Sequence, residues 1–304
     1  MTSPIAEIDR SLGFTIPERH ARGRVVRLAA TVDAVASAHA YPPVIERLLG
    51  EALALTALLG AMLKDNAGQL TLQAQANGVC DLLVCDYQGG ALRGYVKFDA
   101  ERLDELPEEP TLPDLFGTGY LAITFDQAVT GERYQGIVPL EGKSLADAAE
   151  HYFAQSEQIP SLIRISMHDD GIGLVAAGIL LQHLPEGEEG RERLHTRLDH
   201  PEWEHVATLA RTITGDELLD RDLPLETILW RLFNEEEVRV LAGLELARGC
   251  RCDPDHIRDV LMRFPADERQ DMADERGIIS VDCSFCSTVF QVALSELEQP
   301  APHE

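Results

Sequence analysis

The chain is poor in basic residues and has no long apolar run. It holds 26 Lys and Arg against 52 Asp and Glu, a formal net charge of -26 at pH 7. Phosphate binding needs clustered Lys and Arg, so this balance argues against a nucleic-acid partner. The longest apolar stretch, Ala52 to Leu63, is too short to span a bilayer, and the opening MTSPIAEIDRSLGF lacks the features of a signal peptide. We therefore expect a cytoplasmic protein without a membrane span, where disulfides are transient or regulatory.

Cysteine is scarce too, but four of the six cysteines form two short motifs near the C-terminus. Cys250 and Cys252 make a C-x-C, and thirty residues later Cys283 and Cys286 make a C-x-x-C. Two such turns can meet and present four thiolates tetrahedrally to one Zn²⁺. The same thiols can also be oxidised in pairs, and a disulfide and a bound metal exclude each other. A permanent structural zinc module and a redox switch both fit this pattern.

The charges around the two motifs differ. Three arginines surround the first motif: Arg248, Arg251 and Arg258. Positive charge favours the thiolate, which is the form that binds zinc and reacts with peroxide. The second motif lacks this positive charge, and the acidic residue Asp282 directly precedes it. We therefore expect Cys283 and Cys286 to be the less reactive pair.

The remaining cysteines, Cys80 and Cys85, both fall in the strand-like run VCDLLVCDY. A separation of five residues in a regular strand places their side chains on opposite faces and roughly 16 Å apart. Alpha carbons that far apart exceed the limit of roughly 7 Å for a disulfide. We expect two buried core cysteines that do not pair with each other.

Most of the chain has the pattern of an α+β protein. Apolar residues recur at helical spacing after Tyr41-Pro42-Pro43, and Ser144 to Gln155 has the pattern of a helix capped by Ser144. Strand-like runs separated by Asn77-Gly78 and Gly89-Gly90 predict an antiparallel meander, because these dipeptides favour hairpin turns. The strands are expected at QLTLQAQ, CDLLVCDY, LRGYVKFD, YLAITFDQ, RYQGIVPL, SLIRISM and GLVAAGILLQHL. Residues 1–185 are thus predicted to form a core domain with an antiparallel β-sheet and flanking helices.

Residues 186–245 are predicted to form an amphipathic helical linker, and the polar run PEGEEGRER from Pro185 to Arg193 marks a linker or an exposed loop at its start. Apolar stripes at helical spacing need a partner surface, on which they could dock permanently or conditionally. We take these stripes, with both tryptophans, as candidate linker or client-binding residues: Trp203, Val206, Leu209, Ile213, Leu225, Ile228, Leu229, Trp230, Leu232 and Phe233.

Residues 246–304 are predicted to form a small C-terminal domain that depends on zinc. A segment of this size seldom folds by apolar burial alone, whereas structural zinc supplies on the order of 10–16 kcal/mol. Its apolar side chains are too few to replace the metal, so we expect it to unfold when the metal leaves. They are Ile257, Val260, Leu261, Ile278, Ile279, Val281, Val289 and Phe290.

The segments GCRCDPDHIRDVL and VDCSFCSTVF resemble the redox-switch domain of the heat shock protein 33 family. The resemblance continues through ARGRVVRL, YPPVIERLLGEAL, GQLTLQAQ, YQGIVPLEGKSLADAAEHYFAQSEQIP and ILWRLFNEEEVRV, and covers nearly the whole chain. It implies an ATP-independent holdase, not an enzyme, that is inactive when reduced.

The same resemblance implies roles for the four cysteines. In the reduced state Cys250, Cys252, Cys283 and Cys286 would hold one Zn²⁺. On oxidation they would form the disulfides Cys250–Cys252 and Cys283–Cys286, with loss of zinc and unfolding of the C-terminal region. The protein would then bind unfolding client proteins, and family members form homodimers when oxidised.

Two other functions fit some of these residues. One is a constitutive protein-binding factor built on a permanent zinc module. The other is a thiol–disulfide oxidoreductase using the C-x-x-C of Cys283 and Cys286, although such sites usually begin a helix in a thioredoxin-like fold. The basic stretch from Arg19 to Arg24 could hold an anion or a carboxylate network, or make surface or interface salt bridges.

Overall fold

The structure is a computed structural model that describes residues 9–63, 66–128, 131–184 and 200–297 of the chain. It consists of two compact units, Met1–Arg248 and Gly249–Glu304. Among the described residues, no helix has both the length and the apolar character that crossing a membrane requires. The polar run predicted from Pro185 to Arg193 lies outside the described residues.

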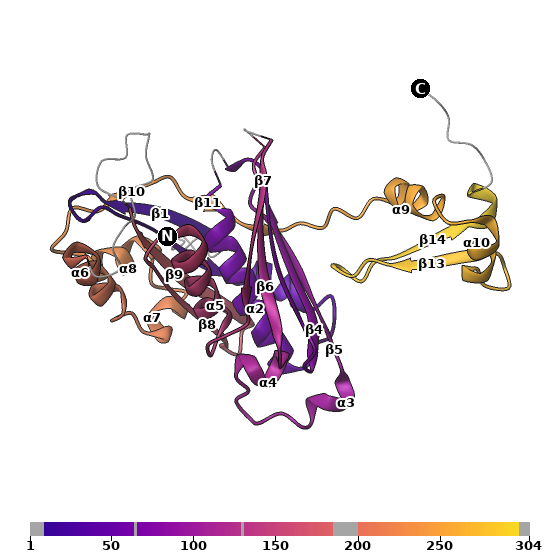
Figure 1. The fold of residues 1–304 in the computed structure, drawn as a ribbon, viewed down its shortest axis with the longest axis horizontal. Coiled ribbons are helices and arrows are strands. Elements are labelled where there is room, and N and C mark those ends of the chain that lie inside the picture. Colours follow the sequence, from indigo (N-terminus) through magenta and orange to yellow (C-terminus); the bar gives the residue numbers. More distant parts are fainter. Residues whose placement is uncertain (1–8, 64–65, 129–130, 185–199, 298–304) are drawn as a thin grey trace, which may run out of the picture. The chain divides into compact units, whose positions relative to one another are not determined.

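The first unit is built on two six-stranded sheets (Figure 1). Their strands are antiparallel except β12, which pairs parallel with β5. In the first sheet the strand order is β10–β1–β2–β9–β8, and β11 also pairs with β1. Its strands are β1 (Arg10–Ile16), β2 (Ala21–Leu28), β8 (Ser161–Asp169), β9 (Leu174–His183), β10 (Arg239–Val240) and β11 (Leu244–Glu245). The second has the order β12–β5–β4–β3–β6–β7: β3 (Gln69–Ala76), β4 (Cys80–Gln88), β5 (Ala91–Phe98), β6 (Gly119–Asp126), β7 (Arg133–Pro139) and β12 (Ala247–Arg248).

Helix α2 (Pro43–Gly60) packs against strands of both sheets, among them β9 and β4. It begins where the sequence predicts, because Pro43 at its first position needs no amide hydrogen-bond partner. Nearly all its residues from Ile45 onward are buried. Every residue from Ala52 to Gly60 is buried, as in a core helix, and α2 is the centre of the main hydrophobic core.

The predicted antiparallel α+β fold is confirmed, including the meander β3–β4–β5. Gly89 and Gly90, in the turn between β4 and β5, have φ of 57° and 89°, a conformation that glycine adopts without steric cost. The helix predicted from Ser144 is α5 (Leu145–Tyr152), whose cap Ser144 accepts a hydrogen bond from the amide of Asp147. Its end continues as a π turn over Phe153–Glu157.

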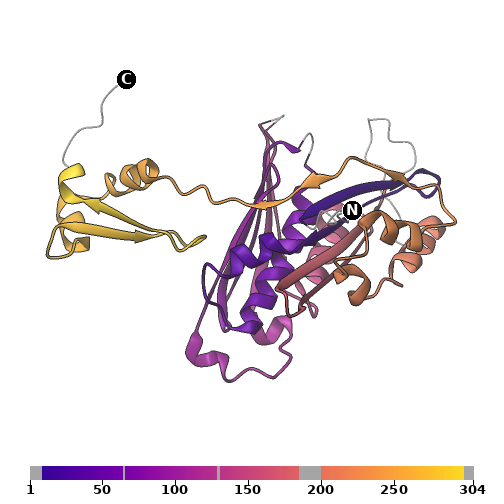
Figure 2. The ribbon, with the colours of Figure 1, turned by 180° about the vertical axis from the view of Figure 1, so that it is seen from behind.

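Three helices of the predicted linker cover the outer face of the first sheet: α6 (Pro201–Ala210), α7 (Gly215–Leu219) and α8 (Leu225–Leu232). Figure 2 shows them in orange beside the sheet. Their stripes join one hydrophobic cluster with residues of β1, β2 and β9 such as Phe14, Val25 and Ile179. The buried members are Trp203, Val206, Leu225, Ile228, Leu229, Leu232 and Phe233, whereas Leu209 and Ile213 are partly buried. Trp230 lies on the other side of α8, 67% exposed.

Several elements of the first unit were not predicted, among them β1, β2 and the helices α1 (Ala30–Ala36), α3 (Ala100–Leu103) and α4 (Leu112–Phe116). The basic stretch turned out to contain the connection between two strands. A single 3₁₀ turn over Pro17–Arg19 leads to His20, which has a φ of 46°, and β2 then carries Arg22 and Arg24.

The predicted placement of Cys80 and Cys85 on opposite faces was wrong. A β-bulge between Cys80 and Leu82 shifts the register of β4 against β5, so that Cys80 pairs with Phe98 and Cys85 with Gly94. Opposed residues point to one face, and residues 94 and 98 of β5 share a face. Both cysteines therefore point into the core, where both are buried as expected.

The second unit is small. It contains α9 (Pro254–Leu261), α10 (Ala266–Met272), the hairpin of β13 (Ile278–Asp282) and β14 (Val289–Ala293), and a 3₁₀ turn over Leu294–Glu296. Among its described residues, the buried hydrophobic cluster comprises Leu261, Ile279, Val292 and Leu297.

Candidate metal centre

The first cysteine motif lies in the irregular segment that leads into α9. Cys250 and Cys252 come directly before Asp253, whose side chain caps the helix by accepting from the amide of Asp255. Pro254 at the first helical position stops any extension of α9 toward the cysteines. The cap and the proline thus hold the C-x-C in an open turn just before the helix.

The second motif forms the turn of the β13–β14 hairpin. The amides of Cys286 and Ser287 both donate to the carbonyl of Cys283, over 3.2 Å and 2.8 Å, and the amide of Cys283 donates to the carbonyl of Thr288 over 3.0 Å. Ser287 has a φ of 55°, which reverses the chain direction. This turn places Cys283 and Cys286 side by side at the end of the hairpin.

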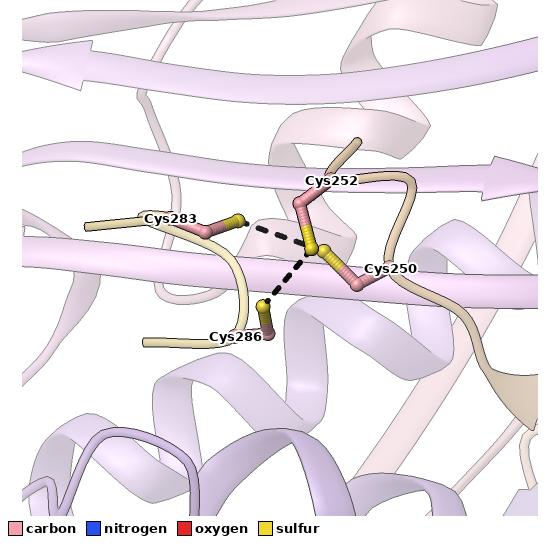
Figure 3. Close-up of side chains that lie close together, drawn as sticks. All are labelled: Cys250, Cys252, Cys283 and Cys286. Atoms are coloured by element: carbon pink, nitrogen blue, oxygen red, sulfur yellow. Dashed lines mark hydrogen bonds between the residues drawn. The ribbon is translucent and has the colours of Figure 1, made fainter. Parts of the chain in front are cut away.

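The sulfur atoms of the two motifs lie close together and form one cluster (Figure 3). Sγ of Cys250 lies 3.6 Å from Sγ of Cys283, and Sγ of Cys252 lies 3.5 Å from Sγ of Cys286. All four lie within 4.8 Å of one another, and among the described residues they are the one group of three or more side chains suited to a metal ion. A regular tetrahedron with Zn–S bonds of about 2.3 Å has sulfur–sulfur edges of about 3.8 Å. The cluster fits such an ion closely.

A metal ion held by these four donors would be structural rather than catalytic. Four cysteine ligands close the coordination shell, so no position is left for water or substrate. All four are free thiols of intermediate exposure, and the sulfur separations exceed the disulfide bond length of about 2.05 Å. The four thiols are therefore compatible with one Zn²⁺ and remain available for oxidation.

The thiols of the cluster differ in acidity. Burial raises the pKa of Cys252 to about 12, and the neighbouring thiols add to the effect. Burial also raises the pKa of Cys283. For Cys286 burial acts in the same direction, but hydrogen bonding with Thr288, whose Oγ1 lies 3.1 Å from the sulfur, and with neighbouring thiols lowers the pKa to about 6.

The raised pKa of Cys252 and the lowered pKa of Cys286 run opposite to the reactivity order that the arginines predict, whereas the raised pKa of Cys283 agrees with it. One of the three arginines, Arg258, pairs with the carboxylates of Asp255 and Glu296. The role of Thr288 was not predicted from the sequence, in which its only indication is a hydroxyl residue two positions after Cys286. The order in which the pairs oxidise stays a prediction.

Cys80 and Cys85 take no part in this cluster. Burial raises the pKa of Cys80 to about 12 and raises that of Cys85 further. Oxidants react with exposed thiolates, so buried thiols of this kind resist them. Both cysteines have the properties of packing residues.

Comparison with known proteins decides the family. The family model described as Hsp33 protein matches residues 9–293. The chain belongs to the Hsp33 family. A 33 kDa chaperonin of Caulobacter vibrioides is 42% identical over 287 residues, which are 92% of this chain and 93% of that protein. A 33 kDa chaperonin of Pseudomonas aeruginosa is 36% identical over 298 residues, 96% of this chain and 94% of the relative.

A solved structure of the Hsp33 family has the same fold. The crystal structure of the 33 kDa chaperonin from Thermotoga maritima matches with a TM-score of 0.79 and 24% identity, over 95% of this chain and 97% of that one. The resemblance noted in the sequence is confirmed. This Hsp33 family chaperone carries its cluster of four cysteines in the C-terminal unit.

Proposed function

We propose that this protein is a redox-regulated, ATP-independent holdase that is inactive while its four C-terminal cysteines hold one Zn²⁺ and active once they are oxidised. The observation that carries the proposal is the cluster of four free thiols inside a unit with almost no core. Burying the four apolar side chains of its cluster contributes about 6–12 kcal/mol in all, whereas structural zinc alone contributes about 10–16 kcal/mol. The metal is then the main source of stability of this unit.

Oxidation removes the metal by removing its ligands. Each pair of zinc-bound thiolates gives up two electrons to peroxide, which takes up two protons from the solvent and is reduced to two molecules of water as a disulfide forms. We propose the pairs Cys250–Cys252 and Cys283–Cys286, which the resemblance to the Hsp33 family implies. Disulfide sulfur is not a thiolate ligand, so Zn²⁺ leaves and residues 249–297 unfold.

Unfolding then spreads to the segment before the cysteines. Strand β12 at Ala247–Arg248 directly precedes Cys250 and holds to the sheet by a short pairing with β5. Once that pairing and the two-residue pairings of β11 and β10 with β1 are lost, the chain is free up to α8, and α6–α8 undock. Their stripes and the face of the first sheet that they cover then become apolar surface for unfolding clients.

The remaining properties follow from composition and from the family. The net charge of -26 opposes aggregation of a molecule with exposed apolar surface. We propose that the protein acts in the cytoplasm without catalysing a reaction, and that it forms a homodimer when oxidised.

The test is light scattering from a thermolabile client protein mixed with reduced, zinc-loaded protein or with peroxide-treated protein, in buffer without ATP. A chromogenic chelator follows released zinc in the same samples. We expect only the oxidised protein to suppress aggregation, in step with zinc release. Cys286→Ser should lose zinc and its redox control, whereas Cys80→Ala, a buried cysteine outside the cluster, should keep both.

Other outcomes separate the alternatives. Equal suppression by both samples with zinc retained would indicate a constitutive zinc-module binding factor. Multiple turnovers of disulfide reduction in a substrate would indicate an oxidoreductase, since a holdase acts in proportion to its own concentration.

A further inference from the structure

The part of the basic stretch in β2 lines a cavity that the proposed function does not use. The cavity measures about 160 Å³ and lies in the first unit, on the face of the first sheet that carries Arg22 and Arg24. The register sets Arg22 opposite Thr15 of β1 and Gln182 of β9, and Arg24 opposite Gly13 and Leu180. Opposed residues share a face, so these polar side chains converge on one patch of the sheet.

The cavity lies beyond the C-terminal end of α2, which covers the rest of this face of the sheet. Further along β2, Val26 and Leu28 are core residues on the same face. Helix α2 stops at Gly60, and Met62 beyond it forms one wall of the cavity. The opposite part of the rim is Leu241, which follows β10 and whose amide donates to the carbonyl of Gly13 over 2.8 Å.

Arg24 lines the cavity with a guanidinium that is available to bind a ligand. Among the residues that the structure describes, no carboxylate and no hydrogen-bond acceptor pairs with its guanidinium, and the charged or titratable groups that act on it are Arg22 and the phenol of Tyr87. Burial lowers the pKa of Arg24. A desolvated cation is unfavourable unless an anion compensates it, so the site as it stands calls for a negative group.

Neighbouring residues keep this guanidinium in the cavity. Gly13 leaves room for it, because an added Cβ there would lie 3.3 Å from Nη1 of Arg24 and 3.2 Å from Cδ1 of Leu241. Nε and Nη2 of Arg22 donate to the side-chain oxygen of Gln182 over 3.2 Å and 3.1 Å, which fixes a second positive charge beside the first. Neither of these contacts uses the donors of Arg24.

The walls define the class of ligand. A guanidinium offers a planar fork of donors that matches a carboxylate in two parallel hydrogen bonds. The apolar side chains of Met62, Leu180 and Leu241 would be left uncovered by an inorganic ion. A cavity of about 150 Å³ accommodates one benzene molecule. We propose that this pocket binds a small organic monocarboxylate with a compact apolar body, of the size of benzoate.

The experiment is calorimetric titration of the full-length, reduced and zinc-loaded protein with sodium benzoate. Benzamide serves as the uncharged analogue and inorganic phosphate as the anion without an apolar body. We expect one saturable site for benzoate, with benzamide and phosphate at least about tenfold weaker, because each lacks one half of the recognition. Phosphate binding as tight as benzoate would mean a plain anion site, and benzamide binding as tight would mean that Arg24 plays no part. Either result, or no saturable binding of benzoate, would overturn the proposal.

Variants locate the site. Arg24→Met should weaken benzoate binding at least about tenfold, whereas Arg133→Met, at an exposed position on β7, should bind like the unmodified protein. Leu241→Trp should also block binding, by filling the cavity while keeping both arginines. Without ligand, Arg24→Met should melt no lower than the unmodified protein, since it removes a desolvated charge that has no partner among the described residues. Unchanged binding in both pocket variants would place benzoate elsewhere and contradict the assignment.

Discussion

Arg27 on β2 donates from Nε to the main-chain carbonyl of Leu218, over 2.7 Å, at the end of α7. Its Nη1 donates to the carbonyl of Leu223 over the same distance. Burial lowers the pKa of Arg27 to about 10, so it remains charged at neutral pH. The last carbonyls of a helix lack partners within it and carry partial negative charge, which a buried cation satisfies. One side chain of the sheet thus fastens the helices that the proposed mechanism must release.

Replacing Arg27 with Met should loosen these helices. It leaves the carbonyls of Leu218 and Leu223 without their donor, at about 1–3 kcal/mol for each buried group. We expect amides of α7 and α8 to exchange hydrogen faster by a corresponding factor, and the oxidised protein to activate sooner. Arg231→Met is the matched control, because its ion pair with Glu217 is half-exposed and contributes at most about 1 kcal/mol. Equal exchange in the two variants would show that Arg27 does not fasten the helices.

Removing the metal without oxidation should unfold the second unit and leave the main core of the first unit folded. With a strong chelator and a reductant present, we expect amides of β13 and β14 to lose protection, because Leu261, Ile279, Val292 and Leu297 cannot hold the unit together. Amides of β3 and β4, in the main core, should keep theirs and serve as the internal control. Persistent protection of the β13–β14 hairpin after zinc is gone would count against the energetic basis of the switch.

Glu51 should make the first unit less stable as pH rises from about 4.5 to about 7. Burial raises its pKa from the ordinary value of 4.5 to about 7, although Arg47 one turn earlier acts in the opposite direction. Between these two values the folded chain holds a proton that the unfolded chain has released. The stabilisation is complete below the lower value and lost above the upper one, up to about 3 kcal/mol.

Urea denaturation across this pH range measures the effect of Glu51. Glu51→Gln should flatten the pH dependence and make the protein more stable than the unmodified chain at pH 8. Glu235→Gln, at an exposed side chain, should follow the unmodified protein. A pH profile of Glu51→Gln that matches the unmodified protein would exclude Glu51 as its origin.

Ile228 and Trp230 on α8 should respond oppositely to truncation. Ile228 is fully buried against the first sheet, and Ile228→Ala should cost about 2–5 kcal/mol in the docking of α8. Trp230→Ala should change the free energy of unfolding by at most about 0.5 kcal/mol, because the ring is largely exposed. Guanidinium denaturation measures both, and a large loss in Trp230→Ala would show that the indole has a packing role.

Local patterns predicted the elements whose signals are short in range. Ser144 as a cap, Pro43 as a helix start and Gly89-Gly90 as a turn each depend on neighbours within a few residues, and all three are in place. The alternation of Leu12, Phe14 and Ile16 in β1 was missed, and β2 escaped prediction because arginines stand at three of its eight positions. The sheet that they join is buried on both sides, against α2 on one face and against α6–α8 on the other.

The sequence by itself determined the family, the α+β class and the four cysteines, because their spacing and the periodicity of the strands are local properties of the chain. Only the tertiary structure brought Cys252 to 3.5 Å from Cys286, turned Cys80 to the same face as Cys85, and set Arg24 in a cavity and Arg27 on the carbonyl of Leu218. These relationships depend on a bulge, on strand register and on the meeting of segments far apart in the sequence, 191 residues for Arg27 and Leu218.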